Sequence, residues 1–390
     1  MENPDKRFSV KAVFAAACAG MFFFGIALIS LGSILPFISS KFGLNGSSAS
    51  TVVTLLPAGV LLGSIVFGPV VDRFGYKSML IISSLITIAG LSGIALAGNL
   101  TEVRIAVFLT GFGGGILNGE TNTIVSDISG DNRNSNLSFL AIFFGIGALG
   151  VPALMSLLTS RYMFETILKG TSLFMILIVV LFFFIKFPSP RQSQGFPLKE
   201  GFRLLKQPLL LLLSLALFFE SGMEGLSNNW TTTFLEAGSV PREKALFSLT
   251  CMVIGMTSAR LFLGIILKRI KSPVVIISGL AAIVLGIIVL LTGMAGHAVG
   301  MTLLGIGFAP VFPVILGYIG TLYPELPGTA FSIALFIALI GNTSLNFAMG
   351  FITDKVGISA FPFMLLVSVS LMAGIIIIAL RKDSLITKIK

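Results

Sequence analysis

Hydrophobic residues occur along this chain in twelve long runs that are separated by short polar segments. A helix needs roughly 20 mainly apolar residues to cross the hydrocarbon core of a bilayer, and every run is long enough. The pattern therefore predicts an all-α membrane protein. We expect transmembrane helices over residues 9–38, 48–71, 78–98, 102–126, 136–159, 165–187, 208–235, 243–267, 273–294, 297–322, 328–353 and 359–380.

One extended polar segment, residues 188–207, separates the first six runs from the last six and is rich in Pro, Ser, Gln, Lys and Arg. We therefore predict an N-terminal six-helix bundle over 1–187, a cytoplasmic linker over 188–207 and a C-terminal six-helix bundle over 208–390. Equal halves of six spans favour a duplicated unit, related by a pseudo-twofold axis along the membrane normal.

Composition and charge support a lipid environment. The chain is 55% hydrophobic and 11% charged, whereas soluble domains carry about 25% charged residues. Its net charge of +10 does not indicate nucleic-acid binding, because most Lys and Arg residues lie in loops on the same side as the N-terminus. This bias predicts that both termini are cytoplasmic. We expect a monomer in the plasma membrane, the inner membrane of a bacterium, with the lipid bilayer as its partner.

The loop between the second and third runs reads Gly68-Pro-Val-Val-Asp72-Arg73-Phe-Gly75-Tyr-Lys77. Gly75 permits a tight turn, Asp72 is suited to capping or ion pairing at a helix end, and Arg73 and Lys77 favour the inner membrane face. The alternative is a polar loop without a specific role. The segment resembles the signature loop of the major facilitator superfamily, G-x-x-x-D-R-x-G-[RY]-[RK]. That resemblance implies that the loop governs closure of the cytoplasmic side.

Two carboxylates one helical turn apart, Glu220 and Glu224, lie in the seventh run. A carboxylate in the middle of a membrane helix is costly, so we expect Glu224 to face a water-filled cavity or a partner. Glu220 and Glu224 would then tend to hold one proton between them. The alternatives are a structural Glu224, paired with a neighbouring donor, and a solvated Glu220 near the cytoplasmic end. Arg260 in the eighth run either balances one of these acids or extends to the inner surface.

Trp230 is the only tryptophan, and Asn228 and Asn229 directly precede it. The indole ring is suited to stacking on the apolar face of a sugar, with the two amides as hydrogen-bond partners. Anchoring at the membrane interface is the alternative, because Trp is common near the ends of spans.

Two pairs of asparagines, each four residues apart, occupy the fourth and eleventh runs. Asn118 and Asn122 share one helix face, as do Asn342 and Asn346. Amides both donate and accept hydrogen bonds, which suits neutral hydroxyl groups. Hydrogen bonding between helices is the alternative for each amide taken singly, whereas the four together favour a polar solute cavity.

Further motifs narrow the resemblance within the superfamily. The Glu224–Trp230 spacing and the run Gly305-Ile-Gly307-Phe-Ala-Pro310-Val-Phe-Pro313 are similar to the fucose permease group of proton-coupled sugar transporters. That resemblance implies a gating role for Arg260 near the inner end of its helix. The group often has an acid four residues before an asparagine in the fourth span. This chain has Asn118 there, with Glu120 on another face, so Glu120 is expected either to bind the proton or to pair with a basic residue.

Together these features predict a secondary transporter rather than an enzyme. We expect uptake of a neutral polar solute, such as a monosaccharide, as two bundles rock about a site near the bilayer midplane. The proton is the coupling ion, and neither a cofactor nor a metal site is expected. The alternatives are an exporter of drugs or metabolites, a lipid flippase, and a membrane sensor or scaffold that transports nothing.

Overall fold

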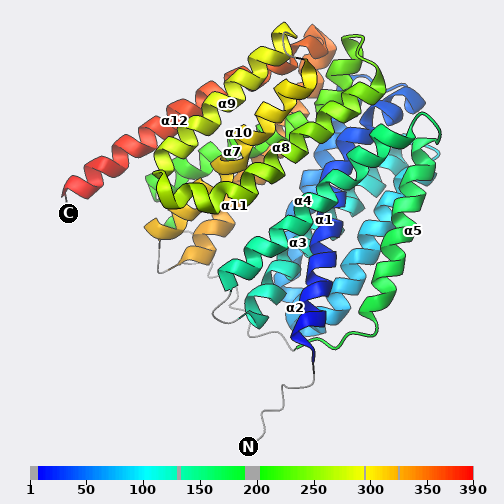
Figure 1. Ribbon diagram of the computed structural model, residues 1–390, viewed down its shortest axis with the longest axis horizontal. Coiled ribbons are helices and arrows are strands. Elements are labelled where there is room, and N and C mark those ends of the chain that lie inside the picture. Colours follow the sequence, from blue (N-terminus) through cyan, green and yellow to red (C-terminus); the bar gives the residue numbers. More distant parts are fainter. Residues whose placement is uncertain (1–7, 130–132, 189–202, 294–295, 324–325, 390) are drawn as a thin grey trace, which may run out of the picture. The chain divides into compact units, whose positions relative to one another are not determined.

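The computed structural model describes residues 8–129, 133–188, 203–293, 296–323 and 326–389 (Figure 1). In the first half of the chain the helices are α1 Val10–Phe42, α2 Gly46–Leu96, α3 Leu100–Ile128, α4 Arg133–Leu158 and α5 Phe164–Phe182. In the second half they are α7 Pro208–Ala237, α8 Arg242–Arg269, α9 Ser272–Thr292, α10 His297–Leu322, α11 Pro327–Val356, the short 3-10 helix η2 Ile358–Ala360 and α12 Phe361–Ile389.

Within these ranges, 12 segments are helical, long enough and apolar enough to cross a membrane. The prediction of an all-α protein with twelve spans is therefore confirmed. Two of the spans, Gly46–Phe67 and Phe74–Leu96, belong to α2, which is kinked near the start of the second span. Gly75 lies at the kink with φ 74° and ψ 165°, a conformation that glycine adopts without the steric cost of a Cβ atom. The expected tight turn in this loop is therefore present.

Helix ends follow the local sequence. Ser9 precedes α1 and its hydroxyl accepts a hydrogen bond from the backbone N–H of Ala12, while Gly43 ends the helix with a φ of 61°. Asn99 accepts from the backbone N–H of Glu102 at the start of α3, and the Glu102 carboxylate accepts from the Gly98 N–H at 2.7 Å. These contacts satisfy backbone groups that a helix terminus otherwise leaves unpaired.

The chain divides into two compact units, one formed by residues 1–44 and 51–195 and the other by 45–50 and 196–390. Residues 45–50 group with the second unit because Asp354 of α11 accepts hydrogen bonds from the backbone N–H groups of Gly46 and Ser47, at 2.6 and 2.8 Å. Most of the predicted linker over 188–207 lies outside the described residues, as only 188 and 203–207 are included.

Small residues allow the helices of each unit to approach closely. In the first unit, Gly25 of α1 lies directly against the backbone of Phe144 in α4, and Gly147 of α4 lies against the backbone of Phe22 in α1. In the second unit, α7 packs mainly on α11 and α12, and α10 packs on α8 and α9. The glycines at the α1–α4 contact thus have a packing role, since a Cβ atom at either position would overlap backbone atoms.

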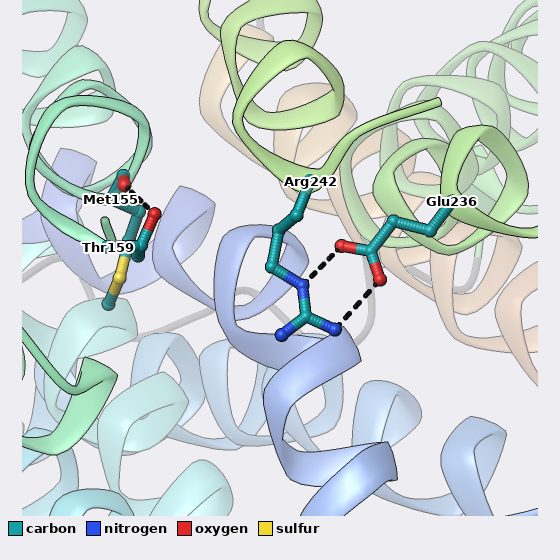
Figure 2. Close-up of polar contacts among 4 residues, drawn as sticks. All are labelled: Met155, Thr159, Glu236 and Arg242. Atoms are coloured by element: carbon teal, nitrogen blue, oxygen red, sulfur yellow. Dashed lines mark hydrogen bonds and ion pairs between the residues drawn. The ribbon is translucent and has the colours of Figure 1, made fainter. Parts of the chain in front are cut away.

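An ion pair joins the end of α7 to the start of α8. Arg242 donates from Nε to Glu236 Oε1 at 2.7 Å and from Nη2 to Oε2 at 3.0 Å, as Figure 2 shows. The pair spans the short loop between the two helices. A planar guanidinium that binds both carboxylate oxygens fixes orientation as well as distance, so the two helix ends are held in one geometry.

Candidate functional site

One face of α7 carries a stripe of polar side chains. Glu220, Glu224 and Asn228 follow one another at intervals of four residues and therefore share this face. Glu220 is fully buried, whereas 15% of the Glu224 side chain is exposed. Arg260 of α8 lies beside the stripe, with Nη2 3.5 Å from Glu224 Oε2. The structure thus brings together three charged residues that are up to 40 positions apart in the sequence.

These three residues leave one negative charge in excess if all of them are ionised. Both carboxylate oxygens of Glu220 lack a hydrogen-bond partner among the described residues, although Glu220 lies close enough to interact electrostatically with Glu224 and Arg260. Of the two partners expected for Arg260, Glu224 is the one it contacts. Because the two acids are adjacent and one guanidinium faces them, a single bound proton makes the cluster neutral.

A second polar stripe on α7 faces α11. Asn342 of α11 donates to the backbone carbonyl of Ser221 at 3.0 Å. Asn346 Oδ1 accepts both from Asn229 Nδ2 at 3.2 Å and from the Trp230 indole N–H at 3.1 Å. Only 1% of Trp230 is exposed, which argues against the alternative that it anchors the protein at the membrane surface. Asn342 and Asn346 thus make the hydrogen bonds between helices that were the alternative for these amides.

The two asparagine pairs have the same internal geometry but different surroundings. Asn346 donates to the Asn342 backbone carbonyl at 2.9 Å and to its side-chain oxygen at 3.0 Å. Asn122 donates to the same two atoms of Asn118, at 2.8 and 3.1 Å. Asn346 is buried against α7, whereas Asn122 is exposed and Asn118 half-buried. In the described part of the first unit, neither of this second pair hydrogen-bonds to another helix.

The amides of Asn118 and Asn122 lie between two packed faces of α3. Gly114 of α3 packs on α1 and Gly115 packs on the first half of α2. Asn118 lies four residues after Gly114 and three after Gly115, and Asn122 lies seven residues after Gly115. At these spacings both amides lie on the side of α3 where the face toward α1 meets the face toward α2. Among the described residues, no other helix uses the side-chain donors and acceptors of these two amides.

Glu120 lies on the opposite side of α3 from these amides, as the sequence spacing predicted. It is fully buried, and the Ser83 hydroxyl and the Leu80 backbone of α2 are the polar groups beside its carboxyl. Neither carboxylate oxygen makes a hydrogen bond within the described chain, and no ion pair with a described Lys or Arg involves it. The expected pairing with a basic residue is therefore not seen in these ranges.

The signature loop lies at the end of the first unit where α5 ends. Lys77 donates to the Phe183 carbonyl at the end of α5, at 2.6 Å. The side chains of Asp72 and Arg73 lie outside the described residues, so their predicted gating role stays a prediction, as does that of Lys77 and Gly75.

Sequence reasoning missed one contact next to this loop. The Tyr76 hydroxyl donates to Asp127 Oδ2 at 2.6 Å, joining the second half of α2 to the end of α3. The signal that could have found it is the spacing of seven between Glu120 and Asp127, which places both acids on one face of α3.

In the described part of the chain, 12 helical segments long and apolar enough to span a membrane, grouped in two compact units, are the architecture of a multi-pass membrane protein. The sequence matches the family model of the Major Facilitator Superfamily over residues 15–342, so the chain belongs to this family of transporters. The predicted membership is confirmed, whereas the narrower resemblance to the fucose permease group stays a prediction.

Individual relatives and structures agree with this family. The glucose/mannose transporter GlcP of Bacillus subtilis (strain 168) is 22% identical over 347 residues, which is 84% of this chain and 85% of GlcP. A crystal structure of a mutant of the nucleoside transporter NupG matches with a TM-score of 0.79 and 15% identity, covering 95% of this chain and 99% of that one. A D-xylose-proton symporter structure matches with a TM-score of 0.75, 15% identity and coverage of 93% and 97%. At these identities the structural matches show the fold alone.

Proposed function

We propose that this transporter takes up a neutral polar solute, such as a monosaccharide, together with a proton by alternating access. The observation that carries the proposal is the cluster of Glu220, Glu224 and Arg260, in which two carboxylates face one guanidinium. The similarity to a glucose/mannose transporter over most of both chains supports the solute class. The excess of Lys and Arg on the side of the N-terminus supports cytoplasmic termini in a bacterial inner membrane.

The environment of each acid supports a division of labour. Glu224 is partly exposed and has Arg260 as a counter-ion. Glu220 is fully buried and has no hydrogen-bond partner among the described residues, and a buried carboxyl without a partner is less costly when it carries a proton. We therefore place the proton of the cluster on Glu220. Entry of each proton contributes about 2.3 kcal/mol for every 100 mV of membrane potential. This free energy is enough to accumulate the solute more than tenfold inside the cell at that potential.

Amide groups supply the solute contacts. Asn118 and Asn122 present donors and acceptors that no other described helix uses. In the second unit, the side-chain oxygens of Asn228 and Asn229 are buried without a hydrogen-bond partner among the described residues. Hydroxyl groups of a sugar donate and accept at the same time, so they match these atoms. The indole ring of Trp230, next to these amides, is proposed as an apolar contact for the solute.

The test is accumulation of labelled sugars by the protein in liposomes under an imposed proton gradient. We expect Glu220→Gln and Glu224→Gln each to abolish accumulation above equilibrium, because an amide cannot take up and release a proton. Exchange of labelled for unlabelled sugar should persist in part, since it needs no net proton movement. Glu236→Gln is the control on the same helix, because Glu236 pairs with Arg242 and should leave accumulation intact. Undiminished accumulation in both acid variants would refute proton coupling at this cluster.

A further inference from the structure

Outside the α7 cluster, the buried acid Glu120 lies in the seam between the second half of α2 and α3. Polar groups of the two helices meet here at two levels. Tyr76 bonds to Asp127 at the inner level, and Ser83 lies beside Glu120 at the deeper level. Each helix advances seven residues between the levels, which is about 10.5 Å of helix. The second half of α2 and α3 run in opposite directions, so a single alignment of these two helices produces both contacts.

Apolar side chains fill the seam between these two levels. Leu80 of α2 and Ile124 of α3 are both 0% exposed, and the neighbouring Met79 is 3% exposed. Leu80 also lies one turn from Tyr76, and Ile124 lies one turn from Glu120, so they occupy the interval between the polar contacts. The Glu120 carboxyl is therefore separated from the inner end of the unit by a dry apolar layer.

The charged and titratable groups that face this seam can be named for the described residues. Asp127 comes from α3, and Tyr76 and Lys77 come from α2, where Lys77 is held by the Phe183 carbonyl. From α1, Gly20 packs against α3 next to Glu120, and the ionisable group nearest to Gly20 in that helix is the thiol of Cys18. No described cation among these groups forms an ion pair with Glu120, so its charged form is not stabilised while the seam is closed.

We propose that Glu120 is a proton-binding site separate from the α7 cluster, sealed by Leu80 and Ile124, and that the Tyr76–Asp127 hydrogen bond is the latch of this seal. While the latch is closed, Glu120 holds its proton in an apolar setting. Parting of α2 and α3 at their inner ends admits water, which stabilises the carboxylate and lets the proton leave toward the inner side. The role of this step in uptake rests on the proposed function, whereas the latch itself does not.

The latch can be tested by hydrogen–deuterium exchange of the Glu120 carboxyl in the full-length protein in liposomes. Infrared spectroscopy detects a protonated carboxyl by its C=O stretch, and the Glu120 band is the one that Glu120→Gln removes. We expect Tyr76→Phe to speed exchange of this band roughly tenfold, because a hydrogen bond to a charged acceptor is lost. Leu80→Ala should also speed exchange, since it thins the apolar layer. Tyr162→Phe is the control, because Tyr162 is 54% exposed and far from the seam in sequence.

Each other outcome would overturn a stated part of the proposal. Absence of a Glu120 band would mean that the carboxyl is ionised and is no proton site. Slower exchange in Tyr76→Phe would make Tyr76 a proton relay rather than a latch. Unchanged exchange in both Tyr76→Phe and Leu80→Ala would mean that the seam does not control access. Asp127→Asn removes the charged acceptor without altering Tyr76, so faster exchange there is expected if Tyr76→Phe fails to fold.

These measurements use neither solute nor a proton gradient. Their failure is therefore distinguishable from failure of the proposed uptake, which the Glu220→Gln accumulation assay reports. If Glu220→Gln loses accumulation while Tyr76→Phe and Leu80→Ala leave Glu120 exchange unchanged, only the α7 cluster is supported as a proton site. If Glu220→Gln keeps accumulation while Tyr76→Phe and Leu80→Ala speed Glu120 exchange, only the Glu120 site is supported.

Discussion

Asparagine side chains in this protein serve two different purposes, and their surroundings decide which. Asn346 accepts hydrogen bonds from Asn229 and Trp230, so it joins α11 to α7. Asn122 is exposed and bonds only to Asn118 of its own helix among the described residues. A buried donor that loses its acceptor costs stability, while an exposed amide does not. The two positions therefore form a matched pair for mutagenesis.

We expect Asn346→Ala to lower the free energy of unfolding by about 1–3 kcal/mol, because the Trp230 N–H and the Asn229 amide lose their acceptor. Asn122→Ala should leave stability unchanged and weaken sugar binding roughly tenfold, since it removes proposed solute contacts. Thermal unfolding in detergent, with and without sugars, measures both effects. Equal losses of stability in the two variants would contradict this assignment.

At the residue scale, the sequence predicted which side chains are candidates for the site better than it predicted which residues they contact. The positions of Glu220 and Glu224 one turn apart follow from helix geometry, and the structure keeps them on one face. The pairing of Arg260 with Glu224 and of Trp230 with Asn346 depends on which helices are neighbours. Those contacts cross 36 and 116 residues, so no local pattern could specify them.

At the scale of helices, close approach of backbones depends on single glycines. Gly147 of α4 lies against the Phe22 backbone, whereas Gly170 of α5 has open space where a Cβ atom would be. We expect Gly147→Ala to destabilise the protein by about 1–3 kcal/mol, because α1 and α4 must separate to admit the methyl group. Gly170→Ala should be neutral or slightly stabilising. Melting temperatures in one detergent compare them, and no difference would argue against a packing role for Gly147.

Hydropathy was sufficient to predict the helices themselves, because a span must be apolar along its whole length. The glycine turn at Gly75 was also predictable, since only the local backbone decides it. The alignment of the second half of α2 along α3 could not be predicted from the sequence. The Tyr76–Asp127 contact depends on how two antiparallel helices are shifted along each other. This shift is set by packing between the helices, and no local sequence pattern predicts it.

At the scale of the whole molecule, the distribution of charge predicts the orientation in the membrane. Ser239, after α7, and Ser272, at the start of α9, are exposed positions at opposite ends of α8. In a chain with Cys18→Ala and Cys251→Ala, we expect an impermeant maleimide to label Ser239→Cys in intact cells. Ser272→Cys should react only after the cells are opened. The reverse pattern would place both termini outside.

Membership of the superfamily could be predicted from the sequence because its signature loop is local and its hydropathy pattern is global. The solute could not be predicted in this way, because the amides proposed to contact it are scattered along the chain and also occur between packed helices. Asn342 and Asn346 illustrate the difficulty, as their spacing is the same as that of Asn118 and Asn122, yet they are hydrogen-bonded to α7.

The two stripes of α7 are offset by a single residue, so Glu220 and Glu224 lie about 100° around the helix axis from Ser221 and Gly225. The second stripe is fixed to α11 by the hydrogen bond from Asn342 to the Ser221 carbonyl. Axial rotation of α7 alone would break this attachment. We therefore expect α7 and α11 to move together when a proton binds to or leaves the acids, and spin-label distances between these two helices should stay constant throughout a transport cycle.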